Sequence, residues 1–509
     1  MAIASVAAIS LFGLAGEVVQ VEADISDGIP SYILLGLPDA ALSESKDRVR
    51  SAIVNSAEPW PNRRVTVALS PAWLPKSGSG FDLPIAISLL LAQGAISESS
   101  THQSIFLAEL GLNGELRPVR GILPALLAAK RMGYTKAYVA RANRIEAGLV
   151  EGVEVIHAAH LKELLVVLRG GVLDTQMGQV TGVPVVAGRS ADLSDVAGQP
   201  QARRAMEIAA VGGHHLLFIG PPGTGKTMLA ERIPSILPPL DREGALEVAA
   251  IASIAGKFLG ATELPTLPPF LAPHHSATAV AMVGGGSHFI KPGLCSLAHR
   301  GVLFIDEAPE CSSGVLDALR QPLESGAVSI SRAIGNVTYP AEFLLILAAN
   351  PCPCGRYSGR GRGCTCSALQ IRRYLQRLSG PILDRIDIRV VVETPSRIEM
   401  AHTGGGEPSE SVRTRVVAAR ERATVRFQGM GWKLNSKIPP RELRQRFTAE
   451  KSAMNLLHQR LEKEEISARG FHKILRVAWS IADLAEHERP NLDDVELALQ
   501  FRQSLGEFV

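Results

Sequence analysis

The residues GPPGTGKT constrain this chain more than any other stretch. They fit the G-x-x-x-x-G-K-[ST] pattern of a phosphate-binding loop, preceded by the apolar run HHLLFIG and followed by MLAERI with helical spacing. Small residues let backbone N–H groups face phosphates, Lys226 adds positive charge, and the Thr227 hydroxyl suits Mg²⁺. A helix-capping turn that binds nothing is the alternative. The pattern predicts a site for ATP and Mg²⁺ made by Gly220, Pro221, Pro222, Gly223, Thr224, Gly225, Lys226 and Thr227.

The composition is that of a soluble globular protein with several domains. The chain has 509 residues, 46% of them hydrophobic, and a formal net charge of +3. This length predicts two to four domains, and the small net charge means that any nucleic-acid surface is local. The apolar start, MAIASVAAISLFGLAG, lacks a basic leader and runs into alternating VVQVEADI, so it predicts a first strand. We expect a cytoplasmic protein without a membrane segment.

Strand and helix patterns divide the chain into four parts. Residues 1–170 mix strands with helices and predict an α+β domain, and residues 171–194 are Gly- and Val-rich and predict a linker. Residues 195–395 form a second α/β block around the phosphate loop, and residues 396–509 are almost wholly helical. The expected fold class is α/β, with a P-loop NTPase core followed by a helical lid.

Two further predicted strands end in side chains suited to nucleotide hydrolysis. The run VLFI ends at Asp306 and Glu307, of which the first can orient the Mg²⁺ shell and the second can polarise the attacking water. A surface acidic turn is the alternative, but unpaired carboxylates beside a buried strand are costly without a function. The run FLLILAA ends at Asn350, whose amide suits the same water; an Asn that merely ends the strand is the rival interpretation.

Two arginines are candidates for contact with the γ-phosphate. Arg385 stands between Asp384 and Asp387 in GPILDRIDIRV, and phosphoryl transfer benefits from an arginine that is often supplied by a neighbouring subunit. Taken alone, such an arginine is more often a salt-bridge partner. Arg469 begins a predicted helix in SARGFHKILRVAWS and is placed to reach phosphates from a lid; a solvated helical arginine is the alternative.

Five motifs in order resemble those of the ComM/YifB family of magnesium-chelatase-like AAA+ ATPases: GPPGTGKT, VLFIDEAPE, LAANPCPCG, GPILDRID and SARGFHKILRVA. The resemblance spans nearly the whole length. It implies an AAA+ core and a homo-oligomeric ring, usually a hexamer, with ATP between subunits. It also implies roles for single residues: Lys226 and Thr227 in Walker A, Asp306 and Glu307 in Walker B, Asn350 as sensor 1, Arg385 as arginine finger and Arg469 as sensor 2.

The same resemblance implies two insertions that face the pore of the ring. One surrounds Gly284–Gly286, although Leu271 stands where the family pattern has a basic residue. The other is GAVSISRAIGNVTYP, residues 326–340, whose alternation predicts a hairpin. In related helicases this hairpin follows a nucleic-acid backbone, which makes Arg332 near its tip the candidate for a phosphate contact. A purely structural hairpin is equally open.

Four of the six cysteines lie within fifteen residues, in CPCGRYSGRGRGCTC. Two C-x-C pairs can surround one tetrahedral Zn²⁺ through Cys352, Cys354, Cys364 and Cys366. Four reduced cysteines in an ordered loop are the alternative. The loop between the pairs is basic and predicts a DNA contact through Arg356, Arg360 and Arg362.

The first 170 residues resemble the proteolytic domain of Lon, a ribosomal-protein-like α+β fold, through LPKSGSGFDLPIAI and LNGELRPVRGILPALLAAKRMG. A Lon-type protease needs a Ser nucleophile and a Lys base. Here Gly80 stands at the nucleophile position and Leu123 at the base position, and Ser79, one residue away, has no evident base. We therefore expect a non-proteolytic Lon-like domain.

The hypothesis that follows is an ATP-driven hexameric helicase that binds branched or single-stranded DNA. The family resemblance implies branch migration during homologous recombination and natural transformation. The alternative is a magnesium-chelatase-type motor subunit that remodels a protein partner. The Lon-like domain and the basic cysteine loop favour the DNA motor, because the family pattern of the chelatase motor subunit is expected to lack both.

Overall fold

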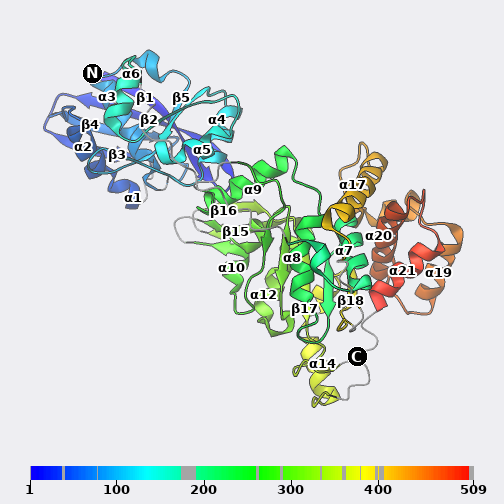
Figure 1. Cartoon of the computed structure of the whole chain (residues 1–509). Coiled ribbons are helices and arrows are strands. Elements are labelled where there is room, and N and C mark those ends of the chain that lie inside the picture. Colours follow the sequence, from blue (N-terminus) through cyan, green and yellow to red (C-terminus); the bar gives the residue numbers. More distant parts are fainter. Residues whose placement is uncertain are drawn as a thin grey trace.

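The computed structural model of the protein describes residues 2–36, 40–76, 78–172, 191–258, 263–286, 290–332, 335–357, 363–378, 380–395, 399 and 406–503. Most of the predicted linker, residues 173–190, lies outside this part of the chain. So do two of the candidate DNA contacts, Arg360 and Arg362. Figure 1 shows the strand-rich N-terminal part in blue and cyan, the second sheet in green, and the C-terminal helices in orange and red.

The apolar N-terminus forms strand β1 (Ala2–Phe12), as the alternation predicts, and pairs antiparallel with β2 (Ala15–Ser26) along its full length. These strands lie inside a seven-stranded sheet ordered β3-β4-β2-β1-β5-β8-β9. The remaining strands are β3 (Ser31–Leu35), β4 (Arg64–Ser70), β5 (Ser104–Leu107), β8 (Lys136–Ala140) and β9 (Glu154–Ala158). Two short strands, β6 (Glu109–Leu110) and β7 (Leu116–Arg117), pair separately.

Alternation along β1 sends its side chains into two cores, because successive residues of a strand face opposite sides of the sheet. Val6 and Ala8 lie in the core that contains α3 (Asp82–Ala92). Ala7 and Ile9 lie in the core that contains α4 (Ile122–Arg131). The other helices of this part are α1 (Ala40–Ser43), α2 (Ser45–Asn55), α5 (Arg144–Gly148) and α6 (Leu161–Leu168).

The second sheet has five parallel strands in the order β11-β14-β17-β10-β18. Their bounds are β10 (Leu216–Ile219), β11 (Phe270–Leu271), β14 (Val302–Ile305), β17 (Leu344–Ala349) and β18 (Ile388–Val391). β10, β14 and β17 are buried at every position, as continuous apolar runs in a parallel sheet predict. The sheet is accompanied by α7 (Pro200–Gly212), α8 (Lys226–Ile236) and α9 (Arg242–Ile254). This mixed α/β architecture with a parallel sheet agrees with the predicted fold class.

The insertions and connections of the second sheet are short elements. The first insertion contains α10 (Ala279–Val283), β12 (Gly284–Gly285) and β13 (Lys291–Pro292), followed by α11 (Leu294–Leu297). The predicted hairpin is present as β15 (Ala327–Arg332) and β16 (Gly335–Pro340), paired antiparallel. Two pairs of helices complete the segment: α12 (Ser313–Ala318) with α13 (Arg320–Ser325), and α14 (Ala368–Gln376) with α15 (Gly380–Leu383).

The C-terminal helices pack on the second sheet through α7 and α8. They are α17 (Ser409–Arg426), α18 (Pro440–Gln445), α19 (Lys451–Glu462), α20 (Ala468–Ala485) and α21 (Leu492–Gln503). Residues of α7, α8, α17 and α20 share one hydrophobic core. Ser467 caps α20 by accepting a hydrogen bond from the Gly470 N–H.

A buried ion pair fixes α20 to the edge of the sheet. Lys473 Nζ donates to Asp387 Oδ1 at 2.6 Å, and His214 Nδ1 lies 3.4 Å from Asp387 Oδ2. Burial alone would raise the pKa of Asp387, but the charge of Lys473 holds it well below its ordinary value. Removing one member of a buried pair typically costs about 3–5 kcal/mol, so this contact holds the C-terminal helices firmly against the second sheet.

The N-terminal sheet contacts the second sheet's helix α9 and its β15–β16 hairpin. The Ser253 hydroxyl of α9 donates to the buried carboxylate of Glu146. A Cβ on Gly335 would lie 2.6 Å from Phe12 Cζ, so the end of β1 packs directly on the hairpin. Burial raises the pKa of Glu146, which is consistent with a carboxylate enclosed at this contact.

Among the described residues, no helix is both long enough and apolar enough to span a membrane.

Candidate nucleotide-hydrolysis site

Three adjacent parallel strands bring the predicted nucleotide-binding residues together. β10, β17 and β14 are neighbours, and each leads at its carboxyl end into one predicted motif: the phosphate loop, Asn350, and Asp306 with Glu307. Because carboxyl ends of parallel strands share one edge of the sheet, residues far apart in sequence meet there. Asn350 and Lys226 are 124 residues apart, yet their side chains are in contact.

The phosphate loop adopts a backbone that needs glycine. Gly223 and Gly225 have φ of 80° and 93°, a left-handed region that other residues rarely adopt. No heavy atom lies within 4 Å of a Cβ built on either residue, so conformation, and not crowding, requires glycine there. At Gly220 the reason is different, since a Cβ would lie 2.2 Å from the carbonyl oxygen of Val392.

Lys226 is the best-anchored side chain of the site. Only 7% of the residue is exposed, and its Nζ donates to the carbonyl oxygens of Gly220 at 2.7 Å and Pro221 at 2.9 Å, and to Asn350 Oδ1 at 3.2 Å. Burial lowers the pKa of Lys226, and the charges of Asp306 and Glu307 oppose that shift. The ammonium group is therefore held at the mouth of the loop, where phosphate oxygens would be its ligands.

Thr227 and Asp306 provide the oxygen ligands that suit Mg²⁺. Thr227 Oγ1 donates to Asp306 Oδ2 at 2.7 Å. The hydroxyl lies at the start of the helix after the phosphate loop, and the carboxylate follows strand β14. This pair fits the chemistry of Mg²⁺, which keeps several waters and takes few protein ligands. Bound there with nucleotide, Mg²⁺ would neutralise phosphate charge.

Glu307 occupies an unusual backbone conformation beside a histidine that the motif analysis did not assign. Its φ is 48°, and its N–H donates to Asp306 Oδ1 at 2.9 Å. Its carboxylate oxygen Oε2 lies 3.3 Å from His275 Nδ1. A positive φ at a residue other than glycine is a strained conformation of the kind found at functional sites, and His275 is the neighbour that the structure pairs with this carboxylate. The pair HH in FLAPHHSATAV is visible in the sequence, but no local pattern connects it with Glu307.

A second residue missed from the sequence is Gln199, which precedes α7. Its side-chain amide donates to the carbonyl oxygens of Glu393 and of Thr224. Gln199 thereby connects the phosphate loop to the residues that follow β18. Nothing in the local sequence distinguishes this glutamine from a surface residue.

The two candidate arginines form a separate group. Arg469 Nη1 donates to Asp384 Oδ2 at 3.0 Å, and Arg385 pairs with Glu324. Within the described residues, neither makes a hydrogen bond to the phosphate-loop group. The ion pair of Arg385 is the arrangement that the salt-bridge alternative predicts for a single chain.

Arg320 joins this arginine group and was also missed. Burial, and then the charges of Arg320 and Arg469, lower the pKa of Arg385, so both of these arginines lie close enough to Arg385 for their charges to act on it. In the described part of the chain, the Nε atoms of Arg320 and Arg385 are buried without a hydrogen-bond partner. Both guanidinium groups also have an ion pair within the chain, Arg320 with Asp317 and Arg385 with Glu324.

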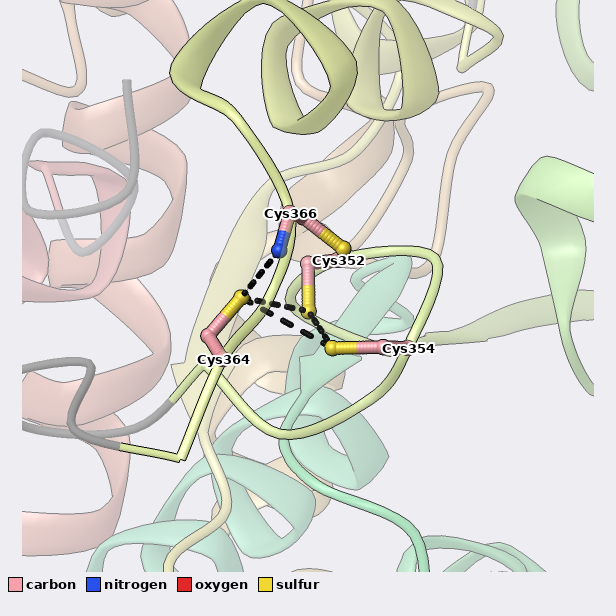
Figure 2. Close-up of side chains that lie close together, drawn as sticks. All are labelled: Cys352, Cys354, Cys364 and Cys366. Carbon is pink, nitrogen blue, oxygen red and sulfur yellow. Dashed lines mark hydrogen bonds between the residues drawn. The ribbon is translucent and has the colours of Figure 1, made fainter.

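The predicted zinc ligands meet in space. Cys352, Cys354, Cys364 and Cys366 offer sulfur atoms that all lie within 4.8 Å of one another, and Figure 2 shows them gathered between two loop segments. Cys352 is fully buried, and Arg356, the described candidate DNA contact in this loop, is exposed.

Arg332 is exposed at the end of β15. A Cβ on Gly285 would lie 3.5 Å from Arg332 Nη2, so the ends of the two predicted insertions adjoin.

Three family models cover most of the chain. Residues 192–400 match "Magnesium chelatase, subunit ChlI", residues 21–143 match "Subunit ChlI of Mg-chelatase", and residues 406–502 match "Magnesium chelatase, subunit ChlI C-terminal". These ranges include the phosphate loop, the two carboxylates, Asn350 and both candidate arginines.

Similar proteins match over nearly their whole length. An uncharacterized protein of Mycobacterium tuberculosis (strain ATCC 25618 / H37Rv) is 47% identical over 99% of both chains. The competence protein ComM of Haemophilus influenzae is 42% identical over 99% of this chain and 98% of its own. The uncharacterized protein YifB of Escherichia coli (strain K12) is 41% identical over 96% of this chain and 95% of its own.

Proposed function

This chain belongs to the ComM/YifB family of magnesium-chelatase-like proteins, and from that premise we propose that it is an ATP-dependent DNA motor, a hexameric helicase that promotes branch migration. The observation that carries the ATPase part is the contact of Lys226 with Asn350 beside the pair Thr227–Asp306. In this proposal Lys226 binds the phosphates, Thr227 and Asp306 hold Mg²⁺, and Glu307 and Asn350 position and polarise the attacking water.

DNA as the partner is supported by two further observations. A relative that matches this chain over nearly its whole length carries the name competence protein, which favours DNA over a protein partner in this proposal. The chain also exposes basic side chains on the insertion and on the cysteine loop, namely Arg332 and Arg356. Arginines of this kind contact phosphates without reading sequence. A role in recombination during natural transformation follows, carried out in the cytoplasm.

The test compares ATP turnover of the purified full chain alone and with four-way, forked, single-stranded and linear duplex DNA. We expect branched DNA to raise turnover several-fold and labelled junctions to be unwound in an ATP-dependent way. Arg332→Ala should lose this stimulation, whereas Arg131→Ala, an exposed arginine on α4, should respond as the natural protein does.

Turnover that no DNA changes, together with intact junctions, would reject the DNA motor. The magnesium-chelatase-type motor, which remodels a protein partner, would then become the leading function, since all three family models carry that name. One of them covers residues 21–143, in the N-terminal part that we expected the chelatase subunit to lack.

The arginine group supports hydrolysis across a subunit boundary. We expect Arg385→Ala to reduce turnover about 10³-fold, as removal of arginine fingers does, and Arg320→Ala to reduce it less. Mixing Arg385→Ala with Lys226→Ala chains should restore activity, because the second chain keeps an intact arginine for its neighbour's nucleotide. Turnover of the mixture that stays at the level of the single variants would reject action between subunits. Nucleotide binding by Arg385→Ala alone checks that its own site is intact.

The first 170 residues have a structural part in this proposal. Leu123 is fully buried in α4, and the hydroxyl of Ser79 donates to Glu109. A buried leucine offers no base to a nucleophile, so we assign this Lon-like part a non-proteolytic role as a scaffold for the ring.

A further inference from the structure

The four-cysteine cluster has the dimensions of a tetrahedral metal site. The Sγ–Sγ distances are 3.4 Å between Cys352 and Cys354, 3.6 Å between Cys352 and Cys364, and 3.7 Å between Cys354 and Cys364. Zinc binds thiolates at about 2.3 Å, which places the sulfurs of a regular tetrahedron about 3.8 Å apart. A disulfide would need a separation of about 2.05 Å, and all four cysteines are free.

The backbone around the cluster supports thiolates. The Cys366 N–H donates to Cys364 Sγ at 3.4 Å, and the Gly355 N–H donates to the Cys352 carbonyl at 2.9 Å, closing a tight turn between the first ligand pair and the next residues. Gly355 has φ of 74°, which suits glycine at this turn. The Cys366 N–H, which donates to sulfur, stabilises negative charge on Cys364, because charge-assisted hydrogen bonds are the stronger kind, whereas the Gly355 N–H only closes the turn.

The cluster holds together a segment that has almost no hydrophobic core of its own. Among the residues of this segment that the structure describes, the buried apolar ones are Cys352 and three side chains of α14: Ile371, Tyr374 and Leu375. α14 begins with a capping box between Ser367 and Gln370. So few buried side chains do not fix a loop of this length, whereas a metal site supplies folding free energy directly.

This segment touches the nucleotide site on two sides. Cys352 comes two residues after Asn350, whose side chain accepts a hydrogen bond from Lys226. A Cβ on Gly355 would lie 2.7 Å from Pro222 Cδ, so the turn between the cysteines packs on the phosphate loop itself.

The third contact between the cysteine segment and the nucleotide site lies next to Glu307. α14 packs against residues 308–310, directly after Glu307. Arg377, after the end of α14, pairs with Glu310 at 3.0 Å. Displacing the cysteine segment therefore displaces Asn350, the phosphate loop and the segment after Glu307 together.

We propose that Cys352, Cys354, Cys364 and Cys366 bind one Zn²⁺, and that this zinc braces the nucleotide site so that nucleotide binding depends on it. The inference rests on the proposed ATPase function. It gives the cluster a positioning role, independent of any contact between the basic loop and DNA. Zinc takes no part in hydrolysis and only fixes where Asn350 and Pro222 lie.

The first measurement is the metal content of the full chain, purified without chelators. We expect about one zinc per chain, and a tetrahedral thiolate spectrum when Co²⁺ replaces it. Cys354→Ser with Cys366→Ser should lose the metal, whereas Cys295→Ala, a buried cysteine of α11, should keep it. Only trace zinc, with no thiolate spectrum from Co²⁺, would overturn the metal site.

The second measurement is the dissociation constant of a fluorescent ATP analogue, with far-UV circular dichroism to report folding. The double variant should bind about tenfold more weakly, the equivalent of losing one charge-assisted hydrogen bond, and Cys295→Ala should bind normally. Should the double variant not fold, zinc is removed from the natural protein with a chelator and then returned. Binding should weaken and recover with the metal.

Zinc loss with unchanged nucleotide binding would overturn the bracing role. This outcome differs from failure of the DNA motor, in which zinc and nucleotide binding are normal and only the response of turnover to DNA is missing.

Discussion

Replacing Lys226 with alanine should weaken ATP binding by a factor of about 100 or more, because two hydrogen bonds from a charged donor to phosphate, each worth about 1.5 kcal/mol or more, are lost. The ammonium group is nearly buried and is held by Gly220, Pro221 and Asn350, so its position beside the loop is fixed before nucleotide binds. Titration with a fluorescent nucleotide measures the effect, and ATP turnover should disappear with it.

A matched lysine variant separates the loss of this contact from a general loss of charge. Lys463→Ala removes an exposed lysine at the end of α19 and should bind ATP as the natural protein does. Circular dichroism establishes that Lys226→Ala is folded. Normal turnover by folded Lys226→Ala would refute the phosphate-loop assignment.

Replacing Glu307 with glutamine should slow hydrolysis by about 10²–10⁴-fold, which is the range that a general base contributes. Glutamine keeps the size of the side chain but cannot accept the proton of the attacking water. The phosphate loop, Lys226 and the Thr227–Asp306 pair are unchanged, so binding should persist and the ring should remain assembled. Single-turnover hydrolysis measured beside equilibrium binding distinguishes the two effects.

The matched control for this substitution is Glu310→Gln, three residues further along the same segment. Glu310 pairs with the exposed Arg377, and a surface ion pair of this kind contributes little, about 0–1 kcal/mol. Its turnover should remain near that of the natural protein. Rapid turnover in Glu307→Gln would remove Glu307 from the mechanism, and another group would then have to polarise the attacking water.

The motif residues of the nucleotide site were predictable because their chemistry requires both residue type and local order. The spacing GPPGTGKT and the runs that end at Asp306 and Asn350 predicted strands followed by functional side chains. The structure has β10, β14 and β17 at those places. Because these strands are parallel, their carboxyl ends lie at the same edge of the sheet, which brings the side chains after them together. The ligand roles themselves stay predictions that the Lys226 and Glu307 variants test.

The partners of these residues were not predictable, since they come from distant segments with no pattern of their own. Gln199 meets Thr224 and Glu393, and His275 meets Glu307, only because the chain returns to the same edge of the sheet. The clustering of Arg320 with Arg385 has the same origin, because α13 and the segment after α15 are neighbours only in space.

The cysteine segment was predictable from the sequence in one respect and not in another. Two C-x-C pairs by themselves predicted a possible zinc site, because four thiolates in a short stretch can close around one ion. Only the fold brought Gly355 onto Pro222, and so placed the cluster against the phosphate loop. Sequence alone determined which groups can bind phosphate and metal, since that depends on the side chains and their local spacing. Tertiary structure decided which of those groups act on one another, because contact depends on how the strands are ordered in the sheet.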